Sequence, residues 1–291
     1  MKITEYPLAT FFDTGDVIIK DGTNGTKKMP ATDLMYALFD GVPEMHNQIY
    51  RGKSLGSTVT STQIDSIADG SFHDLWIGDY WTINGINYRI AHFDYYYNMK
   101  FNVTSGVGGT PFMKHHALIV PDQSLKDDVI YDTGGDRPLG YTETSLYTTS
   151  LPEVRIIFNE AFSDKILTHK LLFTSHADTD GDPDVCNWFD STVDLMNEFM
   201  LWGTTAMSTT QGTPMYTEST LMLKLFEFRP DLRRIESKGS DNNTIWWLRD
   251  VADKGKLNSF GFAAVTSGGA PYWNYTMSKG DIRPFCIIGK N

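Results

Sequence analysis

TIWWLRD at Thr244–Asp250 opens the stretch that decides the fold. The stretch continues through FGF at Phe260–Phe262 and GGAPYWNY at Gly268–Tyr275. It closes with DIRPFCII at Asp281–Ile288. Each run is short, rich in aromatic and β-branched residues, and bounded by Gly, Pro, Asn or Ser, which is typical of strands joined by loops. Two of the runs carry an arginine where a buried strand normally has none. Because a buried guanidinium is stable only when it is paired and hydrogen-bonded, we expect Arg249 and Arg283 to brace loops instead of binding a ligand.

The composition favours a folded, acidic protein. At 291 residues the chain has room for one large or two modest domains, and 41% hydrophobic residues suffice for a sizeable core. The net charge of −11 argues against binding to nucleic-acid phosphates, since proteins that do so carry basic patches. The N-terminus lacks the apolar segment of a secretion signal, and no apolar run is long enough to span a membrane. We therefore expect a soluble protein made in the cytoplasm, with neither nucleic acid nor membrane as a partner.

The N-terminal part of the chain is predicted to be a small unit of its own. Asp16–Lys20 is predicted to be a strand, and Asp21–Thr26 contains the turn-forming pairs Asp-Gly and Asn-Gly. Thr32 and Asp33 are candidates to cap a short helix that ends at Gly41. Since so short a segment cannot bury a core by itself, we interpret it as an attachment module that depends on a partner chain or on the main domain.

The segment Tyr50–Gly56 (YRGKSLG) contains the nucleophile motif G-x-S-x-G with Ser54 at its centre. In hydrolases this motif forms a sharp turn between a strand and a helix of a parallel sheet. No alternation of strands and helices follows it here, so Ser54 lacks the scaffold that a nucleophile needs. We favour a turn that leads into a helix at Thr60–Ala68, and a Ser54-dependent hydrolase is the least favoured alternative.

The clearest local structure is a hairpin centred on Asn84-Gly85. This pair favours a type I′ turn, because both residues accept a positive φ, and alternating apolar residues flank it within Trp81–Ile90. Further along the chain, His115-His116 begins another predicted strand. Adjacent strand residues point to opposite sides, so these histidines cannot chelate one metal ion together, and we expect them to be structural.

The middle of the chain has helical periodicity. Thr142–Ser145 could open one helix, whose apolar residues recur at helical spacing through Leu151–Phe162, and a second helix is predicted from Asp190-Ser191 to Gly203. Between the two lies Asp178–Asp184 (DTDGDPD), whose alternate aspartates suggest a calcium site. The helix-loop-helix calcium pattern, however, requires a glycine and a glutamate at its sixth and twelfth places, and neither is present. A solvated acidic loop is therefore favoured, and calcium binding stays open as the alternative.

Four stretches occur in the same order as in a known group of proteins: Tyr50–Gly56, Ile77–Gly85, His115–Asp122, and the closing pair of Trp247–Arg249 with Ile282–Pro284. In this order they resemble virion proteins of tailed phages and prophages from gut bacteria, which are usually labelled head-fibre or uncharacterised structural proteins. Asp16–Met29 also resembles the short N-terminal unit that begins such fibre proteins. The closing pair is similar to a domain related to the formylglycine-generating-enzyme and C-type-lectin group of folds.

The predicted elements make an α+β protein, mostly antiparallel β with a few helices. The resemblance implies a C-type-lectin-like main domain at residues 46–291, after an attachment unit at residues 1–45. It implies a capsid-attached head fibre or decoration protein located on the virion, whose partners are capsid proteins and further copies of itself in a homotrimer. It does not imply catalysis, because the oxygen-activating members of that fold group need a nearby cysteine pair and Cys186 and Cys286 are far apart. We therefore expect no enzyme activity, no cofactor and no metal.

Adhesion to a host surface is the alternative function, alone or together with the structural one. A carbohydrate- or receptor-binding tail adhesin would stack exposed aromatic residues, such as Tyr272 and Trp273, on the sugar rings of host-surface glycans, and Asn274 would bind their hydroxyl groups. Trp273 also has a structural interpretation. Large aromatic side chains are highly buried on average, so this one is favoured to pack against the rim of the core.

Overall fold

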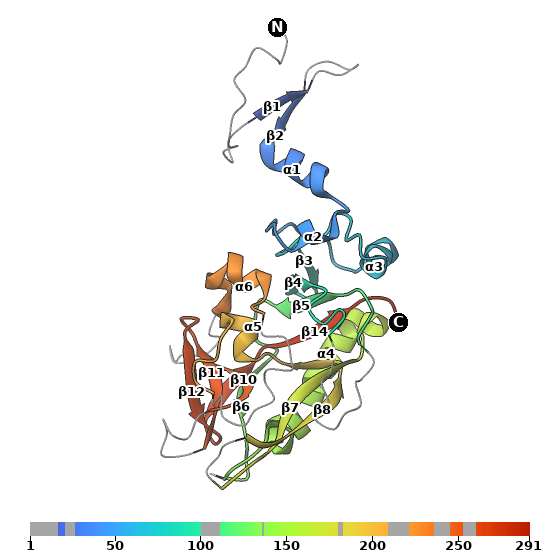
Figure 1. The fold of residues 1–291 in the computed structure, drawn as a ribbon. Coiled ribbons are helices and arrows are strands. Elements are labelled where there is room, and N and C mark those ends of the chain that lie inside the picture. Colours follow the sequence, from blue (N-terminus) through green and yellow to red (C-terminus); the bar gives the residue numbers. More distant parts are fainter. Residues whose placement is uncertain are drawn as a thin grey trace.

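Two five-stranded sheets, a long hairpin and several short helices make up the body of the protein in a computed structural model (Figure 1). The structure describes residues 17–20, 27–99, 111–135, 137–179, 183–208, 221–235, 245–252 and 260–291. Apart from one parallel pair, β10 with β13, the neighbouring strands of these sheets are antiparallel. The predicted α+β class, mostly antiparallel with a few helices, is confirmed.

The first sheet has the strand order β3-β4-β5-β14-β9 and unites distant parts of the chain. Its strands are β3 (Tyr80–Ile83), β4 (Ile86–Phe93), β5 (Ala117–Pro121), β14 (Pro284–Ile288) and β9 (Val193–Leu195). The β3–β4 hairpin turns at Asn84 and Gly85, whose φ angles of 51° and 79° match the predicted type I′ turn. Because β14 pairs with β5, the C-terminal segment completes the sheet that this hairpin begins.

The second sheet has the order β12-β11-β10-β13-β6 and contains the C-terminal runs predicted as strands. Its strands are β12 (Pro271–Tyr275), β11 (Gly261–Thr266), β10 (Ile245–Val251), β13 (Lys279–Ile282) and β6 (Lys126–Ile130). Only Arg283 separates β13 from β14, so a single stretch of chain leaves the second sheet and enters the first.

The two arginines predicted to brace loops donate to backbone carbonyls, which belong to two strands and one turn. Arg283 is buried at the junction of the sheets, where its Nε donates to the Pro121 carbonyl oxygen at 2.8 Å and its Nη1 donates to that of Leu232 at 2.7 Å. Burial lowers the pKa of Arg283 to about 10, which keeps the side chain charged at neutral pH. Arg249 is also buried, and its Nη1 donates to the Leu195 carbonyl oxygen at 3.4 Å.

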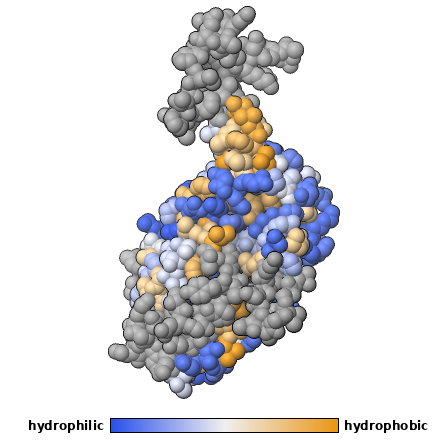
Figure 2. Space-filling model, in the orientation of Figure 1, coloured by the Kyte–Doolittle hydropathy of each residue, from blue (hydrophilic) through white to orange (hydrophobic). Residues whose placement is uncertain are grey.

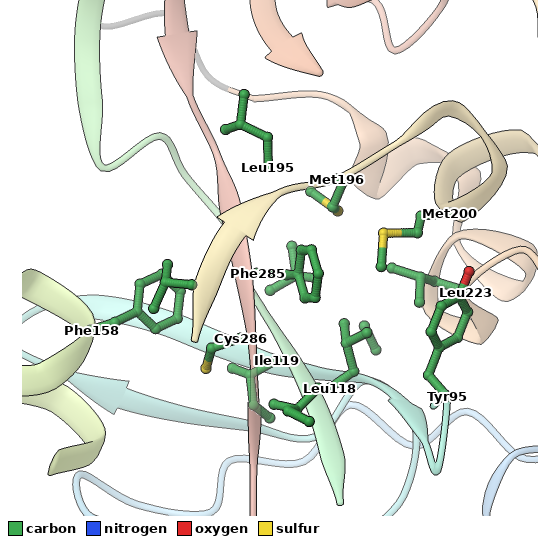
Figure 3. Close-up of a cluster of buried hydrophobic side chains, with 14 of the residues drawn as sticks. Tyr95, Leu118, Ile119, Phe158, Leu195, Met196, Met200, Leu223, Phe285 and Cys286 are labelled. Carbon is green, nitrogen blue, oxygen red and sulfur yellow. The ribbon is translucent and has the colours of Figure 1, made fainter. Parts of the chain in front are cut away.

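One hydrophobic core lies beneath both sheets. Figure 3 shows Leu118 of β5, Phe285 of β14 and Met196 reaching into the same buried cluster. Towards the second sheet, the Tyr131 ring stacks on Phe262 at a centroid distance of 3.9 Å. Four tryptophans are fully buried in this core, namely Trp76, Trp81, Trp246 and Trp247. The aromatic runs of the sequence therefore serve mainly as core.

The helices of the body are short and lie at the margins of the sheets. They are α2 (Pro43–His46), α3 (Ser61–Ala68), α4 (Leu151–Phe162), α5 (Glu198–Trp202) and α6 (Lys224–Phe228), with 3₁₀ turns at Tyr141–Glu143, Ser163–Lys165 and Pro230–Arg233 and a π turn at Leu146–Ser150. The predicted helices at α3 and α4 are confirmed. Helix α3 begins with a capping box, in which Thr60 and Gln63 satisfy each other's backbone N–H. Within the described ranges, none of the helices is long and apolar enough to cross a membrane.

The helix predicted from Asp190 to Gly203 is wrong over its first half. Strands β7 (His169–Ala177) and β8 (Pro183–Ser191) form a hairpin there, and β9 follows it directly. The buried Asp194 carboxylate accepts hydrogen bonds from Tyr141, Ser191 and the Leu195 N–H, which hold this segment extended against its helical periodicity. Only α5 is helical, and it ends at Gly203 in the left-handed conformation as predicted.

The N-terminal unit consists of the β1–β2 hairpin and helix α1, which extend away from the body (Figure 1). Strand β1 (Val17–Lys20) confirms the predicted strand, and it pairs with β2 (Lys27–Pro30). Helix α1 (Ala31–Phe39) is also confirmed, although Pro30 occupies the N-cap in place of Thr32 or Asp33. Proline takes this position readily because a helix start needs no N–H donor there. The predicted turns at Asp21–Thr26 lie outside the described residues.

Gly280 in β13 is expected to be sensitive to any side chain. A Cβ atom there would lie 2.7 Å from Nε1 of Trp247, whose indole donates to the Val129 carbonyl oxygen. We expect Gly280→Ala to lower the free energy of unfolding by about 1–3 kcal/mol through overpacking. Urea unfolding measures this loss. In Gly268→Ala, the new Cβ would meet only Thr266 Oγ1 at 3.7 Å, so this control should unfold like the native chain, and an equal loss in both variants would contradict the steric argument.

Candidate interaction surfaces

Strand β12 carries the two most exposed aromatic side chains of the described residues. Tyr272 is 41% exposed and Tyr275 is 46% exposed, and Met277 follows in the turn at 59%. The strand lies at the end of its sheet, and among the strands that the structure describes it pairs with β11 alone. The exposed rings therefore stand along an open sheet edge.

Trp273 lies between the two tyrosines and contacts both. Its ring is nearly parallel to that of Tyr272, with centroids 6.4 Å apart, and perpendicular to that of Tyr275, with centroids 5.1 Å apart. Gly261 of β11 makes room for the neighbouring strand. A Cβ atom at Gly261 would lie 3.5 Å from the Trp273 indole and 2.5 Å from the Asn274 carbonyl oxygen. Trp273 is half-buried, so it supports the exposed rings more than it offers a face of its own.

Asn274 has a fixed orientation. Its Oδ1 accepts a hydrogen bond from the Tyr275 N–H at 3.0 Å and another from the Ser278 hydroxyl at 2.9 Å. A backbone N–H can only donate, so the amide oxygen faces the turn and the NH₂ group is the free end. The three residues predicted as ligand candidates thus lie together on β12. Tyr275, which sequence reasoning did not select, shares the face of Trp273, because residues two apart on a strand share a face, whereas Tyr272 and Asn274 alternate to the other face.

Helix α1 forms a second surface of unusual composition. Seven of its nine residues (ATDLMYALF) are apolar, yet none of its described side chains is buried. Leu38 is 64% exposed, and Val42 just beyond the helix is 39% exposed. Figure 2 shows this apolar group where α1 meets the body. The Tyr36 ring lies 5.4 Å from that of Trp76, which anchors one side of the helix to the body.

The G-x-S-x-G segment has the geometry of a loop. Ser54 is exposed, and its Oγ accepts a weak hydrogen bond from the Gly56 N–H at 3.4 Å. Within the described part of the chain, no histidine or carboxylate forms a hydrogen bond with Ser54 Oγ. The segment is held instead by Asp79, which accepts from the Lys53 N–H and from the Arg51 guanidinium.

His115 and His116 lie just before β5, which begins at Ala117 and not at His115 as predicted, and they share one aspartate. His115 Nδ1 lies 2.7 Å from Asp94 Oδ2, and the His116 N–H donates to Asp94 Oδ1. The His116 ring is fully buried, with Nδ1 2.9 Å from the Lys114 carbonyl oxygen, and its Nε2 accepts from the Tyr96 N–H. Burial lowers the pKa of His116 to about 4, so the ring is neutral at pH 7. These contacts match the predicted structural role.

Asp194 is a fully buried carboxylate held by hydrogen bonds from several elements. It accepts from the Tyr141 hydroxyl at 2.6 Å and from the Ser191 hydroxyl at 2.8 Å, and Arg155 lies 3.6 Å away. Burial raises the pKa of Asp194 and that of Tyr141. Because Asp194 and Tyr141 are fully buried, a ligand has no access to them, and the cluster braces the joint between β8 and β9.

The acidic stretch Asp178–Asp184 lies at the tip of the β7–β8 hairpin, and its residues 180–182 fall outside the described residues. The predicted choice between a solvated loop and a calcium site therefore stays a prediction. Elsewhere in the described ranges, no three His, Cys, Asp or Glu side chains come together as a metal site would require.

Comparison of the chain with protein families, with curated proteins and with solved structures gives no match. Its function must therefore be inferred from its own surfaces. Two of them, α1 and the aromatic edge at β12, expose apolar side chains that a monomer in water would otherwise bury.

Proposed function

We propose that this chain is a structural protein of a bacteriophage particle, a capsid-attached head fibre or decoration protein. Residues 1–45 would attach it to capsid proteins and to further copies of the chain in a homotrimer, and residues 46–291 would project outward. A C-type-lectin-like architecture is proposed for this body, and its two mostly antiparallel sheets with marginal helices support it. The sequence resemblance to phage head-fibre proteins supports the same function.

The exposed apolar helix α1 is the observation that carries the proposal. A helix that is apolar on most of its surface is normally buried, because exposure of those side chains to water is unfavourable. In this chain it extends from the body with Leu38 and Val42 exposed (Figure 2). An attachment segment that becomes buried on assembly accounts for this arrangement.

Substitution of Leu38 tests the attachment function. We expect Leu38→Asp to weaken incorporation into particles, and self-association in sedimentation experiments, by roughly tenfold or more, since a charge would enter a desolvated contact. The stability of the body should change by no more than about 0.5 kcal/mol. Ile156→Asp, at a residue 58% exposed on α4, is the matched control and should assemble normally.

Immunolabelling of purified particles provides the independent test of location. Antibodies against the body should label the capsid of intact phage particles. The proposal would be contradicted if intact particles carried no label. It would also be contradicted if the Leu38→Asp variant were incorporated into particles as fully as the native chain.

A second function, adhesion to the host surface, is favoured by the exposed rings of Tyr272 and Tyr275. Exposed apolar side chains that lie close together, here with Met277, can mark an interaction site. A projecting fibre places such an edge outward from the particle, so the structural and adhesive functions are compatible.

A further inference from the structure

We propose that His46 is an acid-sensitive restraint that fixes the orientation of helix α1 on the body. The chain passes from α1 to α2 through residues 40–42, which we call the neck, and α2 ends at His46 (Figure 1). The His46 side chain is fully buried there. This inference rests on the proposed attachment function, because α1 is the segment that would make that contact, and it identifies how the direction of the segment is regulated.

Two hydrogen bonds determine the protonation state of His46. Its Nδ1 lies 2.6 Å from the Leu75 carbonyl oxygen, and its Nε2 lies 3.1 Å from the Gly41 amide nitrogen. Because a carbonyl oxygen can only accept and an amide N–H can only donate, Nδ1 carries the proton and Nε2 carries the lone pair. A second proton can add only at Nε2, where it would face the Gly41 N–H. Protonation therefore breaks the bond to Gly41 and leaves the bond to Leu75 in place.

His46 is held firmly by the body, whereas Gly41 belongs to the neck. The imidazole stacks on Trp76 with ring centroids 4.2 Å apart. The neighbouring Asn47 side chain exchanges two hydrogen bonds of 2.9 Å with the Phe93 backbone. Gly41 has a φ of 76°, a conformation that favours glycine and gives the neck its direction. The bond between Gly41 and His46 thus joins the turn after α1 to a fixed support.

Asp40 provides a second polar tie between the neck and the body. Its Oδ1 accepts from the Asp74 N–H at 2.6 Å, and its Oδ2 lies 3.3 Å from His73 Nδ1. The Asp40 side chain is 33% exposed and that of His73 is 61% exposed, so water competes for this pair. Since a buried hydrogen bond is free of that competition, the bond at His46 carries more of the restraint on α1.

The surroundings of His46 keep this bond intact at neutral pH. Burial lowers the pKa of His46 from its ordinary value of 6.5. The Leu75 carbonyl and the Asp40 carboxylate raise this pKa in part, and His73 and Arg51 lower it. Once the neck has moved away, the ring meets water and titrates near 6.5. Because the restrained state binds the proton more weakly than the released state, release becomes more favourable as pH falls below about 6.5.

Hydrogen exchange at the Gly41 amide of the purified full chain measures the restraint directly. The opening constant is the exchange rate divided by the intrinsic rate of an unprotected amide at the same pH. We expect this constant to rise about three- to tenfold between pH 7.5 and pH 5.5. His46→Gln keeps an acceptor for the Gly41 N–H and takes up no proton, so its opening constant should change by less than about twofold.

The amide of Ile90 is the matched reference within the body. It donates to the Asp79 carbonyl oxygen at 2.8 Å, and its exchange reports opening of the body itself. Its opening constant should be far smaller than that of Gly41 at both pH values.

Spin labels measure the orientation of α1. One label is attached through Asp33→Cys on α1 and the other through Thr62→Cys on α3, both at exposed positions, in a Cys186→Ser background. His46→Phe keeps an aromatic ring but neither hydrogen bond. At pH 7.5 the distribution of distances between the labels should be about twofold broader in this variant than with His46 present.

The proposal is overturned if the Gly41 opening constant is the same at pH 7.5 and pH 5.5, or if His46→Gln retains the rise in acid. It is also overturned if Gly41 and Ile90 open equally, since the whole body would then be unfolding, or if the His46→Phe distance distribution stays as narrow as the native one. None of these measurements uses a phage particle. A failed restraint therefore leaves attachment through Leu38 standing, and normal incorporation of Leu38→Asp leaves the restraint standing.

Discussion

Replacement of Asp79 by alanine is expected to lower the free energy of unfolding by about 3–5 kcal/mol. The Asp79 carboxylate is fully buried and accepts from Arg51 Nη2 at 2.6 Å, from the Lys53 N–H at 2.8 Å and from the Trp76 N–H at 2.9 Å. Its removal leaves a nearly buried guanidinium and two N–H groups without their acceptor. Urea unfolding at pH 7 measures the loss.

Asp74→Ala is the matched control, because Asp74 pairs with the same Arg51 but is 65% exposed. Solvent screens such a pair, so the expected loss is about 1 kcal/mol or less. If the two variants lost similar amounts of unfolding free energy, the burial of Asp79 would not explain the strength of its contacts.

Acid should destabilise the body well before its carboxylates are protonated. Burial lowers the pKa of His92 and His169 to about 3 and that of His116 to about 4, whereas an unfolded histidine titrates near 6.5. Between these values the unfolded chain binds more protons, so stability falls as pH falls below about 6.5. At pH 5 each histidine should cost about 2 kcal/mol relative to pH 7.5.

His169→Leu tests this expectation. Neither ring nitrogen of His169 has a hydrogen-bond partner among the described residues, so an apolar side chain of similar size should be tolerated. The variant should lose about 2 kcal/mol less than the native chain between pH 7.5 and pH 5 in urea unfolding. A native profile that is flat from pH 7.5 to 5 would contradict the assignment.

Local signals in the sequence predicted local structure well. Asn84-Gly85 specifies its turn through backbone conformation alone, and Thr60 with Gln63 caps a helix within four residues. The segment after Asp190 was mispredicted because its conformation depends on a distant partner. The Tyr141 hydroxyl reaches the Asp194 carboxylate from far along the chain, and no periodicity in the segment itself records that contact.

The candidate site could be predicted only in part. Tyr272, Trp273 and Asn274 were selected by residue type, and the structure places them on one strand. The order of the sheet, which no single stretch encodes, decides that β12 is an edge and that Tyr275 is exposed there. The exposure of α1 is likewise a property of the assembled body, since the same apolar sequence is typical of a buried helix.

Strand β14 lies between β5 and β9 and hydrogen-bonds to both. During translation these two strands leave the ribosome long before residues 284–288 are made. Their facing edges then remain unpaired, and strands in that condition are prone to join other chains. A nascent chain of this protein should therefore depend on chaperones until β14 emerges, and premature termination upstream of Pro284 should yield aggregates instead of a shortened folded chain.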